Sequence, residues 1–295
     1  MSQPPPPSHP RSGLYMALGA YVIWGVFPLY LRLIADISPW QVVGWRIVFT
    51  VPVCLLFAAV MRQFAGVRAA LSHPRTLITL ALSALLVGGN WVVYIAAINQ
   101  GHVFAASIGY YINPLANVLL GTVFLRERLS KLQWLAVAMA AAGVSVLAWD
   151  ARDMLWISLT LAGSFACYGL VRKLVPVGAL AGLTVESLVL LPPALAILWL
   201  TGADPAIAPS PVTAGLVAAF GVLTAVPLLL FAGAARRMDY STLGFVQYVA
   251  PTLVFFQGLF VFHEPLKQTQ LVCFITIWAA IAVFSWDLWA RRSRA

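Results

Sequence analysis

Ten long apolar segments set the strongest limit on how this chain can fold. A helix that crosses a bilayer needs about 20 apolar residues, and such windows fall at 14–34, 40–61, 76–98, 104–125, 132–149, 154–172, 180–200, 212–235, 241–262 and 268–289. Only 9% of the 295 residues are charged, whereas a soluble domain carries about a quarter. The sequence therefore predicts an all-α integral membrane protein with ten transmembrane helices and short connections.

Basic residues are concentrated in every second connection between the spans, and this pattern predicts the orientation of the chain. If the N-terminus is cytoplasmic, 14 Lys and Arg, among them Arg172 and Lys173, lie on the cytoplasmic side and three lie outside. Cytoplasmic loops carry an excess of Lys and Arg, so we expect both termini in the cytoplasm. Residues 1–13, which are rich in proline, and 290–295 are expected to be cytoplasmic tails, the first of them disordered.

The sequence lacks the motifs that several classes of protein require. The sequence contains no GxxxxGK[ST], HExxH or GxSxG motif, which an ATP-driven pump, a zinc protease and a serine hydrolase would need. The three cysteines lie singly in apolar runs, and the scattered cations form no continuous basic face for nucleic acid. We therefore predict no enzymatic activity, no metal, no cofactor and no nucleic-acid partner.

The two halves of the chain repeat a skeleton of residues at a fixed spacing. Each residue of the first set recurs 137 positions later: Pro114, Gly121, Glu127 and Gln133 are followed by Pro251, Gly258, Glu264 and Gln270. The repeats, 14–149 and 154–289, each hold five spans, so the second copy must enter the membrane in the opposite orientation. Inverted repeats of this kind are typical of secondary transporters, whose substrate site lies between the copies near the bilayer midplane.

Four sequence blocks resemble those of a known transporter family. LVGGNWVVYIAAINQ (86–100), ASIGYYINPLAN (106–117), SFACYGLVRK (164–173) and STLGFVQYVAPTL (241–253) are similar to the RarD-type permeases of the drug/metabolite transporter superfamily, which are built from two EamA-type repeats. The resemblance implies a central cavity and movement of small organic metabolites or drugs across the bacterial inner membrane, usually outward. One departure is that Gly143 in the first repeat is answered by Ala280 in the second.

Polar and aromatic side chains within the spans are candidates for contact with a substrate. They are Tyr21, Trp24, Asn90, Tyr94, Tyr110, Asn113, Asn117, Tyr168, Gln247 and Tyr248. An amide in the membrane must find a partner or line a wet cavity, and amides beside tyrosines suit a pocket for a polar, aromatic solute. The alternative is that these amides join helix to helix.

Two charged residues within spans are candidates for coupling or charge recognition. A charge at the bilayer centre is disfavoured by roughly 2.5–3.5 kcal/mol. We interpret Glu186 as the acceptor of a coupling proton or of a cationic group, and Arg46 as an attractor of anionic groups or as part of an outer gate. The alternative for both is that they reach the interface or cap nearby backbone. Each lies six residues, about 9 Å, below opposite faces, so no direct ion pair between them is expected.

Prolines and acids repeated between the halves have structural interpretations. A proline deletes a helical hydrogen bond, so the matched Pro114 and Pro251 are candidate hinges, with an immobile kink as the alternative. The matched Glu127 and Glu264 are expected to bridge helix ends and loops.

These observations predict a secondary active transporter that works by alternating access. Its partners would be a small organic solute and the lipid bilayer, and proton coupling is a hypothesis. A solute channel and a non-transporting membrane scaffold or sensor are the alternatives. A homodimer is compatible with the sequence, which specifies neither the substrate nor the coupling ion.

Overall fold

The computed structural model of the protein describes residues 10–150, 152–202, 210–263 and 265–292. Every regular element in these ranges is a helix. The α-helices, joined by one short 3-10 turn (Arg152–Met154), are α1 (Pro10–Arg32), α2 (Pro39–Val60), α3 (Phe64–Ser72), α4 (Pro74–Asn99), α5 (Val103–Val123), α6 (Lys131–Asp150), α7 (Leu155–Leu174), α8 (Ala179–Leu200), α9 (Pro211–Ala235), α10 (Tyr240–Gln247), α11 (Val249–Phe260) and α12 (Gln268–Arg292).

Ten segments of the described chain are long and apolar enough to cross a membrane, which confirms the predicted fold class. The pair α10 and α11 forms the ninth segment, the sixth joins the 3-10 turn to α7, and each other segment is one long helix. Residues 10–13 and 290–292, which we had assigned to the tails, instead extend α1 and α12. The remainder of both tails lies outside the described residues.

The short helix α3 was not predicted, because its nine residues are too few to form a span. It forms because Val67 and Ala70 are buried against Leu180 and Ala181 of α8, while Arg68 points to solvent.

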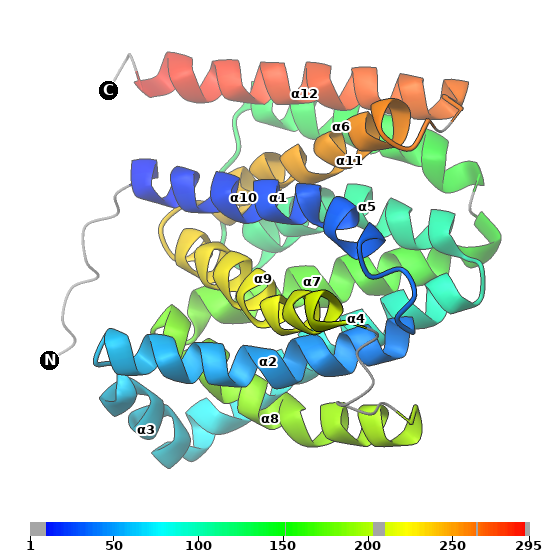
Figure 1. The fold of residues 1–295 in the computed structure, drawn as a ribbon. Coiled ribbons are helices and arrows are strands. Elements are labelled where there is room, and N and C mark those ends of the chain that lie inside the picture. The colour runs from blue at the N-terminus through cyan, green and yellow to red at the C-terminus, as the bar shows by residue number, and fades with distance from the viewer. Residues whose placement is uncertain (1–9, 151, 203–209, 264, 293–295) are drawn as a thin grey trace, which may run out of the picture.

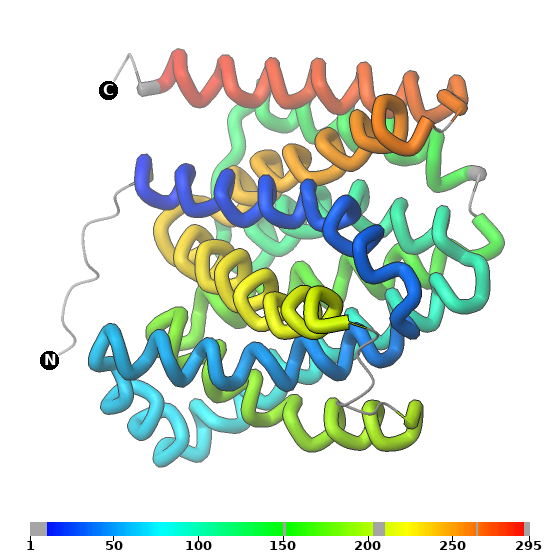
Figure 2. The backbone as a smooth tube through the Cα atoms, viewed as in Figure 1, coloured from blue at the N-terminus to red at the C-terminus, as the bar shows by residue number. Residues whose placement is uncertain are grey.

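All of the spans run roughly along one axis of the molecule. Helix α1 begins and α12 ends at the same end of the bundle, on the left in Figures 1 and 2. We call this the termini end. The opposite end, which carries the connection between α1 and α2, is the loop end. Because the spans alternate in direction, the connections α5–α6, α7–α8 and α9–α10 all lie at the termini end.

The packing of the helices follows the sequence repeat. Helix α6 packs on α12, and α2 packs on α8, so the fifth and the second spans each meet their own counterpart. Figure 1 shows these two pairs along opposite flanks of the bundle. Other contacts occur in exchanged pairs: α5 with α7 matches α1 with α11, and α4 with α7 matches α1 with α9. This pattern is the one expected from two inverted copies, as predicted.

The repeated skeleton has a local physical cause in two matched turns, the one before α6 and the one before α12. Arg126 and His263, which are 137 residues apart, both have positive φ, at 56° and 52°. Gln133 Oε1 accepts a hydrogen bond from the backbone N–H of Ser130, and Gln270 Oε1 accepts one from Lys267. The matched glutamines therefore cap the first turns of α6 and α12. Glu264 lies outside the described residues.

The mismatch between Gly143 and Ala280 falls where α6 and α12 approach closely. A Cβ atom at Gly143 would lie 3.0 Å from the Thr276 side chain and 3.2 Å from the carbonyl oxygen of Cys273. The glycine permits this approach from the α6 side, and small residues commonly serve this purpose in membrane bundles.

Candidate functional site

A cavity of about 380 Å³ lies between the two repeats. Its lining reaches Ala35 and Ile37 in the connection between α1 and α2, so it extends to the loop end. Tyr110 is 47% exposed although it lies within the α5 span, and it lines this cavity. The hollow therefore penetrates the bundle and is accessible.

Most of the predicted contact residues meet around this cavity. The lining includes Tyr21, Trp24, Asn90, Tyr94, Tyr110, Asn113 and Gln247, together with Arg46 and Pro251. The rings of Tyr94 and Tyr110 touch edge to face, with centroids 5.8 Å apart, and Trp24 packs against Phe165 in the same way at 5.6 Å. The cavity thus has an aromatic wall built from both halves of the chain.

The lining amides also join helices, as the alternative interpretation held. The amide nitrogen of Asn90 donates to the Leu161 carbonyl at 2.8 Å and to Ser164 Oγ at 2.9 Å. The amide nitrogen of Asn113 donates to the Ala162 carbonyl at 2.8 Å. All three bonds tie the first repeat to α7, so these donors are already engaged.

Three of the predicted contact residues do not line the cavity. Asn117 is fully buried and donates to Gln247 Oε1 at 2.8 Å. Tyr168 is fully buried, with its ring stacked on that of Phe231. The fully buried Tyr248 donates through its hydroxyl to the Tyr111 carbonyl at 3.4 Å. These side chains lie among packed helices, so in this structure they contact neighbouring helices and not the cavity.

Arg46 lies in the cavity wall and has no acidic partner among the described residues. Its guanidinium carbon is 4.1 Å from the Trp91 ring centroid and 5.8 Å from that of Phe27. Its Nε donates to Thr224 Oγ1 at 3.3 Å. Trp91 belongs to the first repeat and Thr224 to the second, so Arg46 bridges the two.

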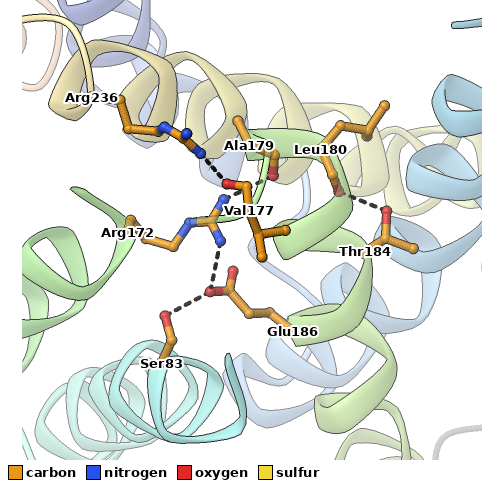
Figure 3. A network of polar contacts seen from close by, with 8 residues as sticks. All are labelled: Ser83, Arg172, Val177, Ala179, Leu180, Thr184, Glu186 and Arg236. Carbon is orange, nitrogen blue, oxygen red and sulfur yellow. Dashed lines mark hydrogen bonds and ion pairs between the residues drawn. The ribbon is translucent and has the colours of Figure 1, made fainter. Parts of the chain in front are cut away.

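Glu186 is paired with Arg172, which the sequence had suggested to be a cytoplasmic topology signal. Arg172 is fully buried and Glu186 is 1% exposed. Glu186 Oε1 accepts a bond from Ser83 Oγ at 2.6 Å and lies 3.4 Å from Arg172 Nη1, while Arg172 Nη2 donates to the Ala179 carbonyl at 2.9 Å. Figure 3 shows the guanidinium between the carboxylate and this carbonyl.

Local sequence makes room for this buried ion pair. A Cβ atom at Gly182 would overlap the Arg172 guanidinium, so the glycine lets the arginine lie against α8. The absence of an ion pair between Glu186 and Arg46 agrees with the depth argument. Glu186 Oε2 has no hydrogen-bond partner among the described residues, and the hydroxyl of Tyr168 lies close to the carboxylate.

Shared side chains connect the surroundings of Glu186 with the lining of the cavity. A small void of about 10 Å³ touches Glu186 and Ser187, and it is also lined by Trp91, Leu228 and Thr224. Trp91 and Leu228 line the large cavity as well. The charge in the cavity wall and the buried carboxylate are therefore neighbours across one layer of side chains.

The termini end is closed by a contact between the repeats. Glu127 Oε1 accepts the backbone N–H of Tyr240 at 2.6 Å, and Oε2 accepts the N–H and the hydroxyl of Ser241 at 2.9 and 2.7 Å. A Cβ atom at Gly121 would lie 2.6 Å from Glu127 Oε2, so this glycine provides the space for the carboxylate. We call this contact the Glu127 clamp. It replaces the expected salt bridge with a cap on the N-terminus of α10.

Two charged side chains near the clamp, Asp239 and Lys173, have opposite effects on it. Asp239, the N-cap residue of α10, makes no side-chain cap bond, and Lys173 Nζ donates to the carbonyls of Ala235 and Met238 at 2.8 and 2.7 Å. Burial raises the pKa of Asp239, and the negative charge of Glu127 adds to this rise while Lys173 opposes it.

The two candidate hinge prolines differ in their local structure. The ninth span ends its first helix at Gln247, whose carbonyl would be the hydrogen-bond partner of residue 251 in a regular helix. Pro251 has no N–H to donate, and α11 starts at Val249, so that Tyr248 alone separates it from α10. Helix α5, in contrast, continues through Pro114. The movement itself remains a prediction.

Comparisons with known proteins, like the fold and the cavity, indicate a membrane transporter. The model of the EamA-like transporter family matches residues 11–149. An uncharacterized transporter of Pseudomonas aeruginosa is 45% identical over 289 residues, covering 95% of each chain. The protein RarD of Salmonella typhimurium is 43% identical over 286 residues, covering 94% of this chain and 95% of the relative.

A protein of known crystal structure is similar in fold. It is 18% identical with a TM-score of 0.73, over 95% of this chain and 99% of the other. At this level of identity the similarity concerns the fold alone.

Proposed function

Because this chain belongs to the EamA-like transporter family, as a RarD-type membrane transporter of the drug/metabolite superfamily, we propose that it is a secondary carrier for a small organic solute. It would work by alternating access, with net export as the family resemblance implies. The bacterial inner membrane would hold it with both termini in the cytoplasm, so that the loop end faces outward.

One observation carries the proposal. The cavity between the repeats reaches the loop end, while the Glu127 clamp joins the repeats at the termini end. A carrier needs a site that is open to one side at a time, and inverted repeats provide two similar gates around it. A channel would instead need a path that reaches both ends at once.

The buried carboxylate of Glu186 supplies a place for a coupling proton. Its pairing with Arg172 is not support for a stabilising role, because the desolvation of a buried ion pair offsets most of its attraction. The small void beside Glu186 shares Trp91 and Leu228 with the lining of the cavity. A proton at Glu186 would release Arg172 and alter the packing of the layer that borders the substrate.

The carrier proposal is tested by exchange in liposomes. A thermal-shift screen of amino acids, vitamins, cationic metabolites and antibiotics would first identify compounds that stabilise the purified protein. Uptake of the best compound into proteoliposomes should saturate and should be accelerated by unlabelled compound inside. Linear flux without this acceleration would indicate a channel. Stabilisation without any flux would indicate a scaffold or a sensor.

The coupling proposal is tested with Glu186→Gln in the same liposomes. We expect gradient-driven accumulation to be lost, while exchange at equal pH on both sides persists. Asp153→Asn is a matched control because Asp153 is exposed at the loop end and its side chain is 90% accessible. Accumulation that survives in Glu186→Gln would remove the coupling role.

A further inference from the structure

Arg46 gives the cavity a definite charge. Among the described residues that line it there is no Asp, Glu, Lys or His, and Arg46 is the only arginine. It is the eighth residue of α2, which places it about 10 Å along that helix from the loop end. Asp36, in the connection at the mouth, is exposed to solvent and does not line the hollow.

The surroundings of Arg46 hold its guanidinium without neutralising it. The Trp91 ring covers one face of the guanidinium, with its centroid 4.1 Å from the guanidinium carbon, and Thr224 Oγ1 accepts a hydrogen bond from Nε. The two terminal nitrogens have no hydrogen-bond or ion-pair partner in the part of the chain that the structure describes. Aromatic contacts of this kind keep the positive charge, so the planar edge of the guanidinium remains available to a ligand.

The free edge of a guanidinium matches one chemical group closely. Its parallel N–H bonds pair with the two oxygens of a carboxylate. A single cation balances a single negative charge, so a phosphate dianion would remain half compensated here. Apart from a few amides and one serine, the remaining wall is aromatic and aliphatic, with Tyr21, Trp24 and Phe165 among its rings.

We propose that the cavity selects a monoanionic organic acid, whose carboxylate pairs with Arg46 and whose apolar or aromatic body contacts the rings of the wall. This inference rests on the proposed carrier function, since it names the class of solute that the same site would take. It also gives the unpaired charge in a membrane span a reason to be present.

Binding to the purified full-length protein tests the inference without requiring transport. Phenylacetate, 3-phenylpropionate and 4-phenylbutyrate would each be compared with their uncharged amides and with amines of equal length, by isothermal titration calorimetry. We expect at least one acid to bind about tenfold or more tightly than its amide and its amine, a difference of about 1.4 kcal/mol.

Substitutions then locate the preference. Arg46→Gln should abolish it, and Arg46→Lys should retain part of it, because lysine keeps the charge and loses the paired N–H groups. Arg32→Gln should retain all of it. Arg32 is a matched control, as it is exposed near the mouth, contacts Phe262 and does not line the cavity.

Either of two results would overturn the inference. The first is a wild-type protein that shows no preference for the acid at any of the three lengths, a result that does not depend on any variant folding. The second is a preference that persists in Arg46→Gln. Failure of the carrier proposal would look different. Acid binding without flux would support the anion site and contradict transport. Saturable exchange of uncharged or cationic solutes, unchanged in Arg46→Gln, would support transport and contradict the anion site.

Discussion

The clamp at the termini end predicts that Glu127→Gln opens this end of the protein. Glu127 accepts three hydrogen bonds from the first turn of α10. Glutamine keeps one acceptor oxygen. Its amide N–H₂ replaces the other oxygen and would face groups of α10 that are themselves donors. The variant also loses the favourable interaction of a negative charge with a helix N-terminus.

The expected magnitude follows from these contacts. A hydrogen bond to a charged group contributes about 1.5–3 kcal/mol net, and loss of one such bond shifts an equilibrium about tenfold or more. If the state with an open termini end is a minor one, its population should rise by roughly that factor. The cavity and its lining are unchanged by the substitution, so binding from the loop end should weaken only through this shift in population.

The assay measures the reactivity of a single cysteine beneath the clamp. Leu243→Cys, in a chain without Cys54, Cys167 and Cys273, places a thiol at a fully buried position of α10 near the clamp. Labelling by a polar maleimide should be about tenfold faster with Glu127→Gln, because the rate follows the open fraction.

Asp287→Asn serves as the control for that assay. Asp287 accepts a bond from Ser130 and pairs with Arg291 at the same end of the bundle, so the variant loses an equal charge away from α10. Its labelling rate should match that of the parent. A labelling rate in Glu127→Gln equal to the parent's would show that the clamp does not close the termini end.

Two further predictions concern the same end. Gly121→Ala should accelerate labelling as Glu127→Gln does, because its Cβ would occupy the space 2.6 Å from Glu127 Oε2, whereas Gly89→Ala should not, since a Cβ there meets nothing within 4 Å; equal rates in the two alanine variants would refute the space argument. Asp239→Asn should raise the melting temperature at about pH 7 and lose this advantage near pH 4. The pKa of Asp239 is raised in the folded protein, so its ionised form is destabilising above that value and the penalty disappears below its ordinary pKa. A pH-independent difference in melting temperature would contradict this assignment.

The sequence was sufficient for the number of spans and for their inverted relation. Both depend on properties that one helix shows alone: the length of an apolar run, the side on which its cations fall and the spacing of a repeated skeleton. The candidate cavity could be predicted in part for the same reason. Asn90 and Tyr94 share a face of α4, and both line the hollow.

What the sequence could not reveal depends on how helices are rotated and tilted against one another. Asn113 and Asn117 share a face of α5, yet the cavity reaches Asn113 and ends before Asn117. Helical spacing specifies a common face but not the depth at which neighbouring helices close over it. Tyr168 was misplaced for the same reason, because Phe231 of α9 covers it.

Arg172 was not predicted as the partner of Glu186, because its position next to Lys173 was read as a signal of the cytoplasmic side and not as part of a pair between neighbouring spans. Arg172 lies in the last turn of α7, where a cation usually marks the cytoplasmic face. A short connection joins α7 to α8, and Glu186 follows within the second turn of α8. An acid and a base near the facing ends of two antiparallel spans were therefore the available signal, and Gly182, which gives the arginine its space, was its local support.

The difference between the matched spans bears on how a carrier of this design would change state. Tyr111 and Tyr248 are 137 residues apart, and they meet in the structure, where the Tyr248 hydroxyl donates to the Tyr111 carbonyl. The chain breaks at Tyr248, between α10 and α11, while α5 runs unbroken through Tyr111. Under the proposed alternating access, inverted copies exchange conformations when the site changes sides. The interruption would then pass from Tyr248 to Tyr111, so that α10 and α11 join into one helix while α5 divides.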